Sequence, residues 1–278
     1  MYCGEFYLKD DELMLEYEDY KYKLINNEYI SVSVIDSSKE KYSDILSEVN
    51  GYPVKSLERC FSNCKSLLES PSIPETVVYM TYCYEDCYHL KEAPIIPESV
   101  IDMNGCFCGC RSLKEAPVIP PNVKDMSCCF CGNNQLVKPP KIPDGVCDLS
   151  YCFYDCSKIE EPPRIPDSVT NMKLCFYYCT SLMYASNIPD GVVDLEGCFY
   201  YCPRITEVFC IPDSVVNMDH CFESCYALKE VPYIPDSVKT MVDCFYDCTF
   251  KYDYENRCIK TDNSEDDNPI DKLKNMTM

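Results

Sequence analysis

The cysteines of this sequence are the residues with the most chemical potential. A Cys-aromatic-x-x-Cys pattern returns every 23 residues, and its first cysteine is Cys60, Cys83, Cys106, Cys129, Cys152, Cys175, Cys198, Cys221 or Cys244. Thiols can form disulfides, bind soft metal ions or pack as small apolar side chains. The spacing is not the Cys-x-x-Cys of zinc ribbons, and the chain has only two histidines. We therefore expect these thiols to fill the interior, with no metal and no cofactor.

One part of the chain is denser in thiols than the rest. Two successive copies of the pattern contain Cys106, Cys108, Cys110, Cys128, Cys129 and Cys131. Cys108 and Cys131 occupy the same place in their copies, so we expect them to be neighbours. A disulfide or a bound metal there, and two exposed thiols, are the alternatives.

An unbroken period of this length indicates a stacked repeat. We number the repeat from position 1, the first cysteine, to position 23. Position 14 is Ile, position 15 is Pro and position 18 is Val in every full copy, while position 8 is Leu or Ile and position 21 is Met or Leu. The run from position 8 to the proline predicts a strand, because proline cannot donate to a strand ladder. Pro-Asp-Ser and Pro-Asp-Gly then predict a turn.

The second half of the repeat predicts a helix. Position 20 is Asp or Asn in most copies, as in Asp102, Asp125 and Asn171, which is suitable for a helix N-cap. From position 21 onward Met or Leu, Cys, Phe and Cys fall on one helical face. We therefore expect an α/β fold in which nine 23-residue coils stack, with a parallel sheet on one face and short helices on the other.

Sequence outside the repeats divides the chain further. Residues 1–53 do not repeat, and the runs Leu13–Tyr20 and Lys21–Ile35 with an Asn26-Asn27 turn predict a β-hairpin, to which residues near Phe6–Leu8 could add a strand. Glu40–Val49 has apolar residues at helical spacing, which predicts a short helix. We interpret 1–53 as an N-terminal cap, with a separate recognition domain as the alternative, and 54–250 as the repeat region. Residues 251–278 are expected to hold a C-terminal cap, with Tyr252 and Tyr254, and an acidic disordered tail.

Two sets of residues are candidates for binding a partner on the strand side. Position 10 forms a row of carboxylates: Glu69, Glu92, Glu115, Glu161, Glu207 and Glu230. This row would recruit a basic partner, or it is simply a solvated face. Position 13 varies from copy to copy and could hold specificity. Its candidates are Ile95, Val118, Lys141, Arg164 and Tyr233.

Tyrosines form a third candidate surface at positions 3 and 4. They are Tyr177, Tyr178, Tyr200 and Tyr201. Tyrosine is favoured in interface hot spots. Packing between neighbouring repeats is the alternative explanation.

Composition and missing motifs exclude several functions. The net charge of −21 disfavours nucleic acid and anionic lipid, and no apolar run is long enough to span a membrane. The first residues lack the pattern of a signal peptide, so we expect a cytoplasmic or virus-borne, host-intracellular protein. Phosphate-loop, GxGxxG, GxSxG and HExxH motifs are all absent, so we do not expect an enzyme.

The string from Asn171 to Leu182, Asn-Met-Lys-Leu-Cys-Phe-Tyr-Tyr-Cys-Thr-Ser-Leu, together with Ile-Pro-Asp-Ser-Val, resembles the BspA-type leucine-rich repeat. The resemblance covers residues 54 to about 250 and implies a non-enzymatic solenoid that binds proteins, often at a cell surface. Position 1 is Cys here, where the family usually has Ala or Met. We therefore expect a scaffold that binds a basic protein partner through its sheet face and variable edge. The alternative is a structural protein whose solenoids self-associate.

Overall fold

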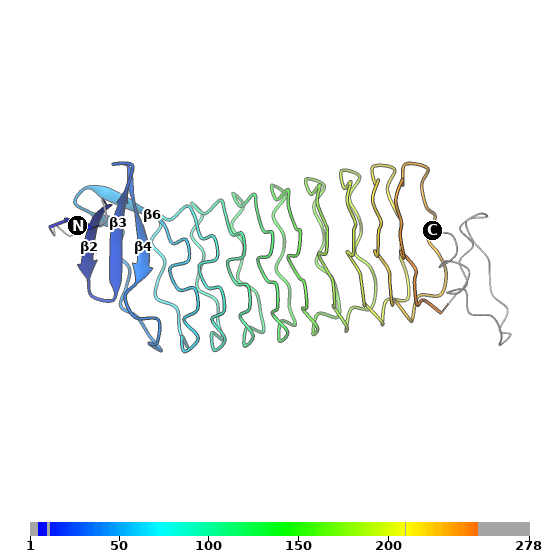
Figure 1. Cartoon of the computed structure of the whole chain (residues 1–278), viewed down its shortest axis with the longest axis horizontal. Helices are drawn as coiled ribbons and strands as arrows, with labels where there is room; N and C mark the ends of the chain where they lie inside the picture. Colours follow the sequence, from blue (N-terminus) through cyan, green and yellow to red (C-terminus); the bar gives the residue numbers. More distant parts are fainter. Residues whose placement is uncertain (1–4, 10–11, 209, 250–278) are drawn as a thin grey trace.

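A computed structural model describes residues 5–9, 12–208 and 210–249. The molecule is elongated, with a sheet at the N-terminal end and a row of stacked loops that follows it (Figure 1). The sheet contains β1 (Tyr7–Lys9), β2 (Glu12–Tyr17), β3 (Tyr20–Ile25), β4 (Tyr29–Val34), β5 (Glu48–Val49) and β6 (Tyr52–Ser56), in the order β1-β2-β3-β4-β6-β5. The expected C-terminal cap and acidic tail at 251–278 lie outside the described residues.

The N-terminal strands follow from their turns. Asn26 and Asn27 have φ values of 50° and 56°, and Glu28 N donates to Ile25 O at 2.9 Å. Asparagine tolerates this left-handed backbone, so the chain reverses tightly between β3 and β4. A second reversal, at Glu18 (φ 51°), separates β2 from β3.

The domain boundaries at residues 53/54 and 250/251 remain predictions. Strand β6 crosses the first of these boundaries.

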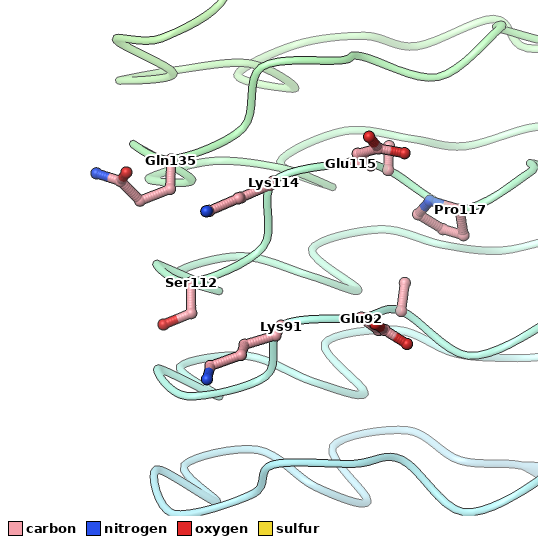
Figure 2. Close-up of a pocket in the computed structure, with 9 residues that line it drawn as sticks. Lys91, Glu92, Ser112, Lys114, Glu115, Pro117 and Gln135 are labelled. Carbon is pink, nitrogen blue, oxygen red and sulfur yellow. The ribbon is translucent and has the colours of Figure 1, made fainter.

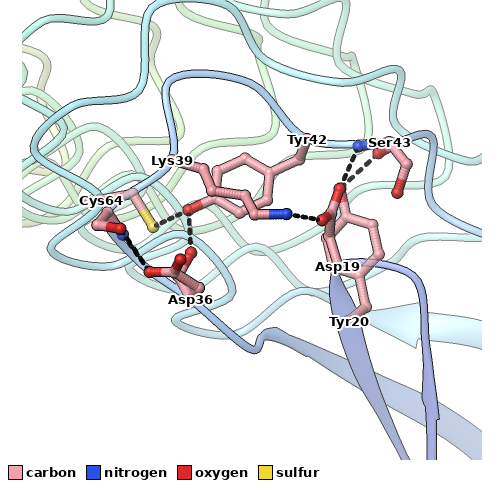
Figure 3. A network of polar contacts seen from close by, with 8 residues as sticks. Asp19, Tyr20, Asp36, Lys39, Tyr42, Ser43 and Cys64 are labelled. Carbon is pink, nitrogen blue, oxygen red and sulfur yellow. Dashed lines mark hydrogen bonds and ion pairs between the residues drawn. The ribbon is translucent and has the colours of Figure 1, made fainter.

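The helix expected over Glu40–Val49 is wrong. This segment is irregular until β5, because side chains of the sheet and of the first repeat bind its backbone and side chains (Figure 3). Asp19 contacts Lys39 and accepts from Ser43 N at 2.6 Å, while Tyr20 Oη donates to Ser43 O at 2.6 Å. Tyr42 Oη contacts Cys64 Sγ at 3.3 Å. The apolar spacing instead reflects burial of Ile45 and Val49 against the sheet.

Backbone pairing between repeats occurs at position 20. Parallel bridges join Ser56 to Tyr79, Tyr79 to Asp102 and so on in 23-residue steps to Thr240. Ile101 N donates to Val78 O at 3.0 Å, and Lys124 N donates to Ile101 O at 2.9 Å. The ladder therefore begins at the end of β6 and continues the sheet by about one bridge per repeat.

The strand expected over positions 8–14 is wrong for most repeats. Among the described residues only Glu115 and Lys138 form a bridge there. Position 12 is occupied by Pro71, Pro94, Pro117, Pro140, Pro163 and Pro232, and position 15 is always proline. Two prolines three residues apart remove the N–H groups that a continuous ladder needs.

The helices expected from position 21 are also wrong, and the fold is not α/β: the described ranges contain no helix. Consecutive tight turns take their place. Cys83 N donates to Met80 O at 3.0 Å, whereas Tyr82 N and Tyr84 N donate across to Asn104 O and Cys106 O, both at 2.8 Å. Alternate amides thus bond within the repeat and to the next repeat. In a helix, all of these amides would donate to carbonyls of the same repeat.

Left-handed residues make this alternation possible. Positive φ recurs at positions 23 and 4 of each repeat, for example 51° at Tyr82 and 57° at Asp86. Position 4 is often Asn, Asp or Gly, which adopt this conformation most readily. The position-20 carboxylates cap the turn instead of a helix: Asp102, Asp125 and Asp148 accept the N–H two residues later, at 2.7–2.9 Å.

The core is one column shared by all repeats. Position-2 rings stack from Phe61 to Phe245 with centroids 5.1–5.9 Å apart. Tyr84 is the tyrosine in this column; it is fully buried, and its hydroxyl lies 2.6 Å from Ser70 Oγ. The leucines, isoleucines, valines and methionines of positions 8, 14, 18 and 21 surround the rings and are largely buried. Neighbouring repeats bury apolar surface against each other, and this gives the stack a stability that no single repeat has.

Candidate functional site

The cysteine ladder lies inside the protein, as expected from its periodicity. The described thiols of positions 1 and 5 are buried except Cys248, which is half-buried, and all are free. Burial raises the pKa of these thiols, for instance Cys106 and Cys152, well above the usual range. Over the described ranges, no group of three or more His, Cys, Asp or Glu side chains could hold a metal ion. Protonated thiols in this setting are inert packing groups.

The position-5 thiols also form a regular set of hydrogen bonds. From Cys87 onward, each donates to the position-2 carbonyl of the preceding repeat, as in Cys87 to Phe61 O at 3.2 Å and Cys179 to Phe153 O at 3.1 Å. Sequence reasoning treated these residues only as small apolar fillers and missed this role. Alanine is smaller than cysteine and has no hydrogen-bond donor. Serine has a hydroxyl that needs stronger hydrogen bonds than a thiol does.

Asn133 interrupts this set of thiols. It replaces the position-5 cysteine of its repeat, is fully buried, and neither its Oδ1 nor its Nδ2 has a hydrogen-bond partner. An unsatisfied buried amide is costly. The sequence shows that this cysteine is missing, but it does not show that the amide in its place has no hydrogen-bond partner.

The glutamate row of position 10 is exposed along the stack, as predicted for a surface feature. The described Glu69, Glu92, Glu115, Glu161, Glu207 and Glu230 are all exposed. Two of them are paired, since Lys41 Nζ lies 2.7 Å from Glu69 and Lys138 Nζ lies 2.6 Å from Glu115. Lys138 and Tyr184 interrupt the row. It is therefore a broken strip rather than one continuous field.

Position 13 holds the most exposed apolar side chains of the described chain. Ile95 is 89% exposed, Val118 is 88% exposed and Tyr233 is 73% exposed. Lys141 and Arg164 are also exposed at this position, and Arg164 lies 3.8 Å from Asp144. Ile95, Val118, Lys141 and Arg164 come from four consecutive repeats, so they form a row. We call this row the variable edge.

Two hollows border the variable edge and the glutamate row. One, of about 790 Å³, is lined on neighbouring repeats by Lys91, Glu92, Ser112, Lys114, Glu115, Pro117 and Gln135 (Figure 2). The lysine amines point to one side of it and the carboxylates to the other. The second, of about 520 Å³, includes Val118, Lys138, Lys141 and several prolines.

The tyrosines lie on the turn side and stack on one another. Ring centroids are 4.6 Å apart for Tyr154 and Tyr177, 4.5 Å for Tyr177 and Tyr200, and 4.6 Å for Tyr178 and Tyr201. Tyr178 is 38% exposed, while Tyr177, Tyr200 and Tyr201 are half-buried. Burial and neighbouring tyrosines raise the pKa of Tyr177 to about 12. These rings are engaged in packing between repeats.

A small hollow beside the tyrosines was not foreseen. It measures about 290 Å³ and includes Tyr177, Gly197, His220 and Glu223. Gly197 has a φ of +56°, and a Cβ there would meet Leu174 Cδ2 at 2.7 Å. His220 Nδ1 lies 2.6 Å from Glu223.

The model of the BspA type leucine-rich repeat region matches this sequence in six copies, over residues 48–137 and 149–254. The chain belongs to the BspA-type leucine-rich repeat family. No curated protein matches it.

Three solved structures resemble the described BspA-type chain. They are the T. pallidum leucine-rich repeat protein TpLRR (21% identity, TM-score 0.49, 76% of this chain and 88% of that one), a leucine-rich repeat protein from Bacteroides ovatus (18%, 0.48, 80% and 83%) and a leucine-rich cell surface protein from Faecalibacterium prausnitzii (17%, 0.46, 84% and 86%). In the ranges described here, no helix is long and apolar enough to cross a membrane.

Proposed function

We propose that this BspA-type repeat protein is a non-enzymatic scaffold that binds a protein partner through the variable edge and the adjoining glutamate row. The repeats would form one solenoid of nine coils that holds these side chains at fixed spacing. The observation that carries the proposal is the near-complete exposure of Ile95 and Val118 in consecutive repeats. Aliphatic side chains aligned on a rigid surface are suited to the apolar centre of an interface.

Charge indicates the kind of partner. Glu92, Glu161, Glu207 and Glu230 are exposed, and no ion pair is recorded for them among the described residues. The chain as a whole carries −21. A partner with an apolar patch rimmed by Lys and Arg would match both the edge and the row, whereas a second copy of this acidic chain would be repelled.

Capture by the full chain tests the proposal. A protein captured by the wild type is purified, and its affinity is measured for I95D/V118D, for E92K/E161K/E207K and for the control V193D. Val193 is 48% exposed and lies at position 19, so it belongs to neither the edge nor the glutamate row. We expect I95D/V118D to weaken binding at least about tenfold, as is usual for central interface residues, and V193D to leave it unchanged.

The charge variant separates the two parts of the proposal. Reversal of the glutamates should weaken binding and flatten its dependence on salt concentration. Unchanged affinity in I95D/V118D would reject the edge as the binding surface. Unchanged affinity and salt dependence in the lysine variant would reject the basic partner. Light scattering of the chain alone identifies a second copy as the occupant if its mass doubles with concentration.

A further inference from the structure

Two half-buried thiols meet on the turn side of neighbouring repeats. Cys108 and Cys131 both occupy position 3, and both are half-buried. Gly109 N donates to Cys131 O at 2.7 Å, and Phe107 N donates to Cys129 O at 2.9 Å. The backbones of the two repeats are therefore bonded together on both sides of Cys108, which fixes the two thiols beside each other.

This arrangement meets the geometric requirement for a disulfide. Chains bonded to each other in this way lie about 4.8 Å apart, and disulfides form between Cα atoms about 4.4–6.8 Å apart. The thiols point to the same side, since they occupy the same repeat position. The bond could therefore form with little movement of the backbone.

The pair also differs chemically from the buried ladder. Contact with the Cys131 thiol lowers the pKa of Cys108, whereas contact with Cys108 raises the pKa of Cys131. The lower pKa favours Cys108 as the attacking thiol and Cys131 as the resolving thiol. Burial raises the pKa of nearby Cys128 to about 11, so this third thiol stays protonated at neutral pH.

We propose that Cys108 and Cys131 are an oxidation site, which a low-molecular-weight disulfide converts to a reversible disulfide between successive repeats. The Cys108 thiolate attacks one sulfur of the oxidant, which forms a mixed disulfide and releases one small thiolate. Cys131 then loses its proton and attacks the Cys108 sulfur, which releases the second small thiolate. Two protein thiols are oxidised, the oxidant's S–S bond is reduced, and two small thiols carry away the protons.

The location of the pair gives the bond a consequence. Cys131 belongs to the repeat that contains Asn133, whose buried amide is unsatisfied. The disulfide would tie this repeat to the preceding one and close a loop from residue 108 to residue 131. Oxidation should therefore stabilise the repeat that contains this unsatisfied amide.

The test uses the full chain with four other thiols removed. Cys147 and Cys210 are exposed and are not aligned with a cysteine in either adjoining repeat, and Cys3 and Cys258 lie outside the described residues. All four are changed to serine in the parent. The reduced parent is incubated at neutral pH with oxidised glutathione, then acid-quenched and measured by intact and tandem mass spectrometry.

We expect the parent to lose about 2 Da, as formation of one disulfide requires, without retaining a glutathione adduct. Tandem spectra should join Cys108 to Cys131, and the oxidised protein should unfold at a higher denaturant concentration than the reduced one. In the matched variant C131S, Cys108 should retain glutathione, because no resolving thiol remains. In C108S, the mass loss should disappear.

Three results would overturn the proposal. They are a glutathione adduct that persists on Cys108 in the parent, a bond from Cys108 to Cys128, and an unchanged mass in a folded parent. Reduced C108S and C131S should unfold at the same midpoint as the reduced parent, which shows that any lost reaction is not lost folding.

Discussion

A single residue type explains much of the interior at the residue scale. Cysteine at position 5 fills a small apolar site and donates to a carbonyl of the preceding repeat, as Cys110 does to Tyr84 O at 3.2 Å. Its weak polarity makes both roles compatible. Asn133 takes the place of this cysteine in its repeat, and both of its amide atoms are left unsatisfied.

Replacing Asn133 with cysteine should therefore stabilise the protein. The new thiol would donate to Phe107 O, as its equivalents do, and two unsatisfied amide atoms would be removed. We expect the free energy of unfolding to rise by about 1–3 kcal/mol, measured by denaturant unfolding under reducing conditions.

Gln135→Cys is the matched control because Gln135 is exposed two residues away. It should leave the free energy of unfolding unchanged. A lower stability for N133C would contradict our view that the asparagine amide is a defect.

Turns dominate the structure at the scale of elements. Met, Cys, Phe and Cys fall on one face of a helix at their spacing, which predicted helices, but the same residues point inward from two consecutive tight turns. The period of 23 and the buried positions could be predicted, because they depend only on stacking. The distribution of amides between a repeat and its neighbour could not, because each hydrogen bond depends on a residue 22 positions away.

A signal for the turns was nevertheless present. Asn63, Asp86, Gly109, Gly132 and Asp155 all fall at position 4, and these residue types favour left-handed backbone.

The candidate surfaces could be predicted only in part. The pattern predicted that the glutamate row is exposed. It did not predict the pairing of Glu115 with Lys138, because that pairing depends on neighbouring repeats lying in register.

Two glycines test the importance of left-handed backbone. Gly132 has φ +72° and its Cβ would meet nothing closer than 3.7 Å, whereas Gly191 has no positive φ and its nearest contact would be 3.5 Å. Gly132→Ala should lower the free energy of unfolding by about 1–2 kcal/mol. Gly191→Ala should leave it unchanged or raise it by up to about 1 kcal/mol.

Thermal and denaturant unfolding of both variants measures this difference. Space is not limiting at either site, so the contrast isolates backbone conformation. Equal effects of the two substitutions would contradict a structural need for left-handed residues at position 4.

The buried thiols act together at the scale of the whole molecule. Folding raises their pKa above the unfolded value of about 8.5, so above that pH the folded state binds more protons than the unfolded state. Their stabilisation is complete below about pH 8.5 and falls as the pH rises toward the folded values, by up to about 1.4 kcal/mol per pH unit for each thiol.

The denaturant midpoint should therefore fall steeply above about pH 8.5 in the presence of a reductant. A variant with Cys175→Ala and Cys198→Ala, both fully buried, removes two titrating groups and should show a shallower fall. A flat profile through this range would contradict burial of the ladder as protonated thiols.

Near-identical repeats face a hazard during folding, since any one of them can dock against the wrong copy. We expect the contact between the Tyr84 and Ser70 hydroxyls to reduce that hazard. Position 11 is Ser in the first repeat and Ala, Pro or Val in the later ones. A chain assembled one copy out of step would therefore trap the Tyr84 hydroxyl among aliphatic groups with nothing to accept its proton. The pair of hydroxyls would therefore form its hydrogen bond only when the first two repeats pack in the correct order.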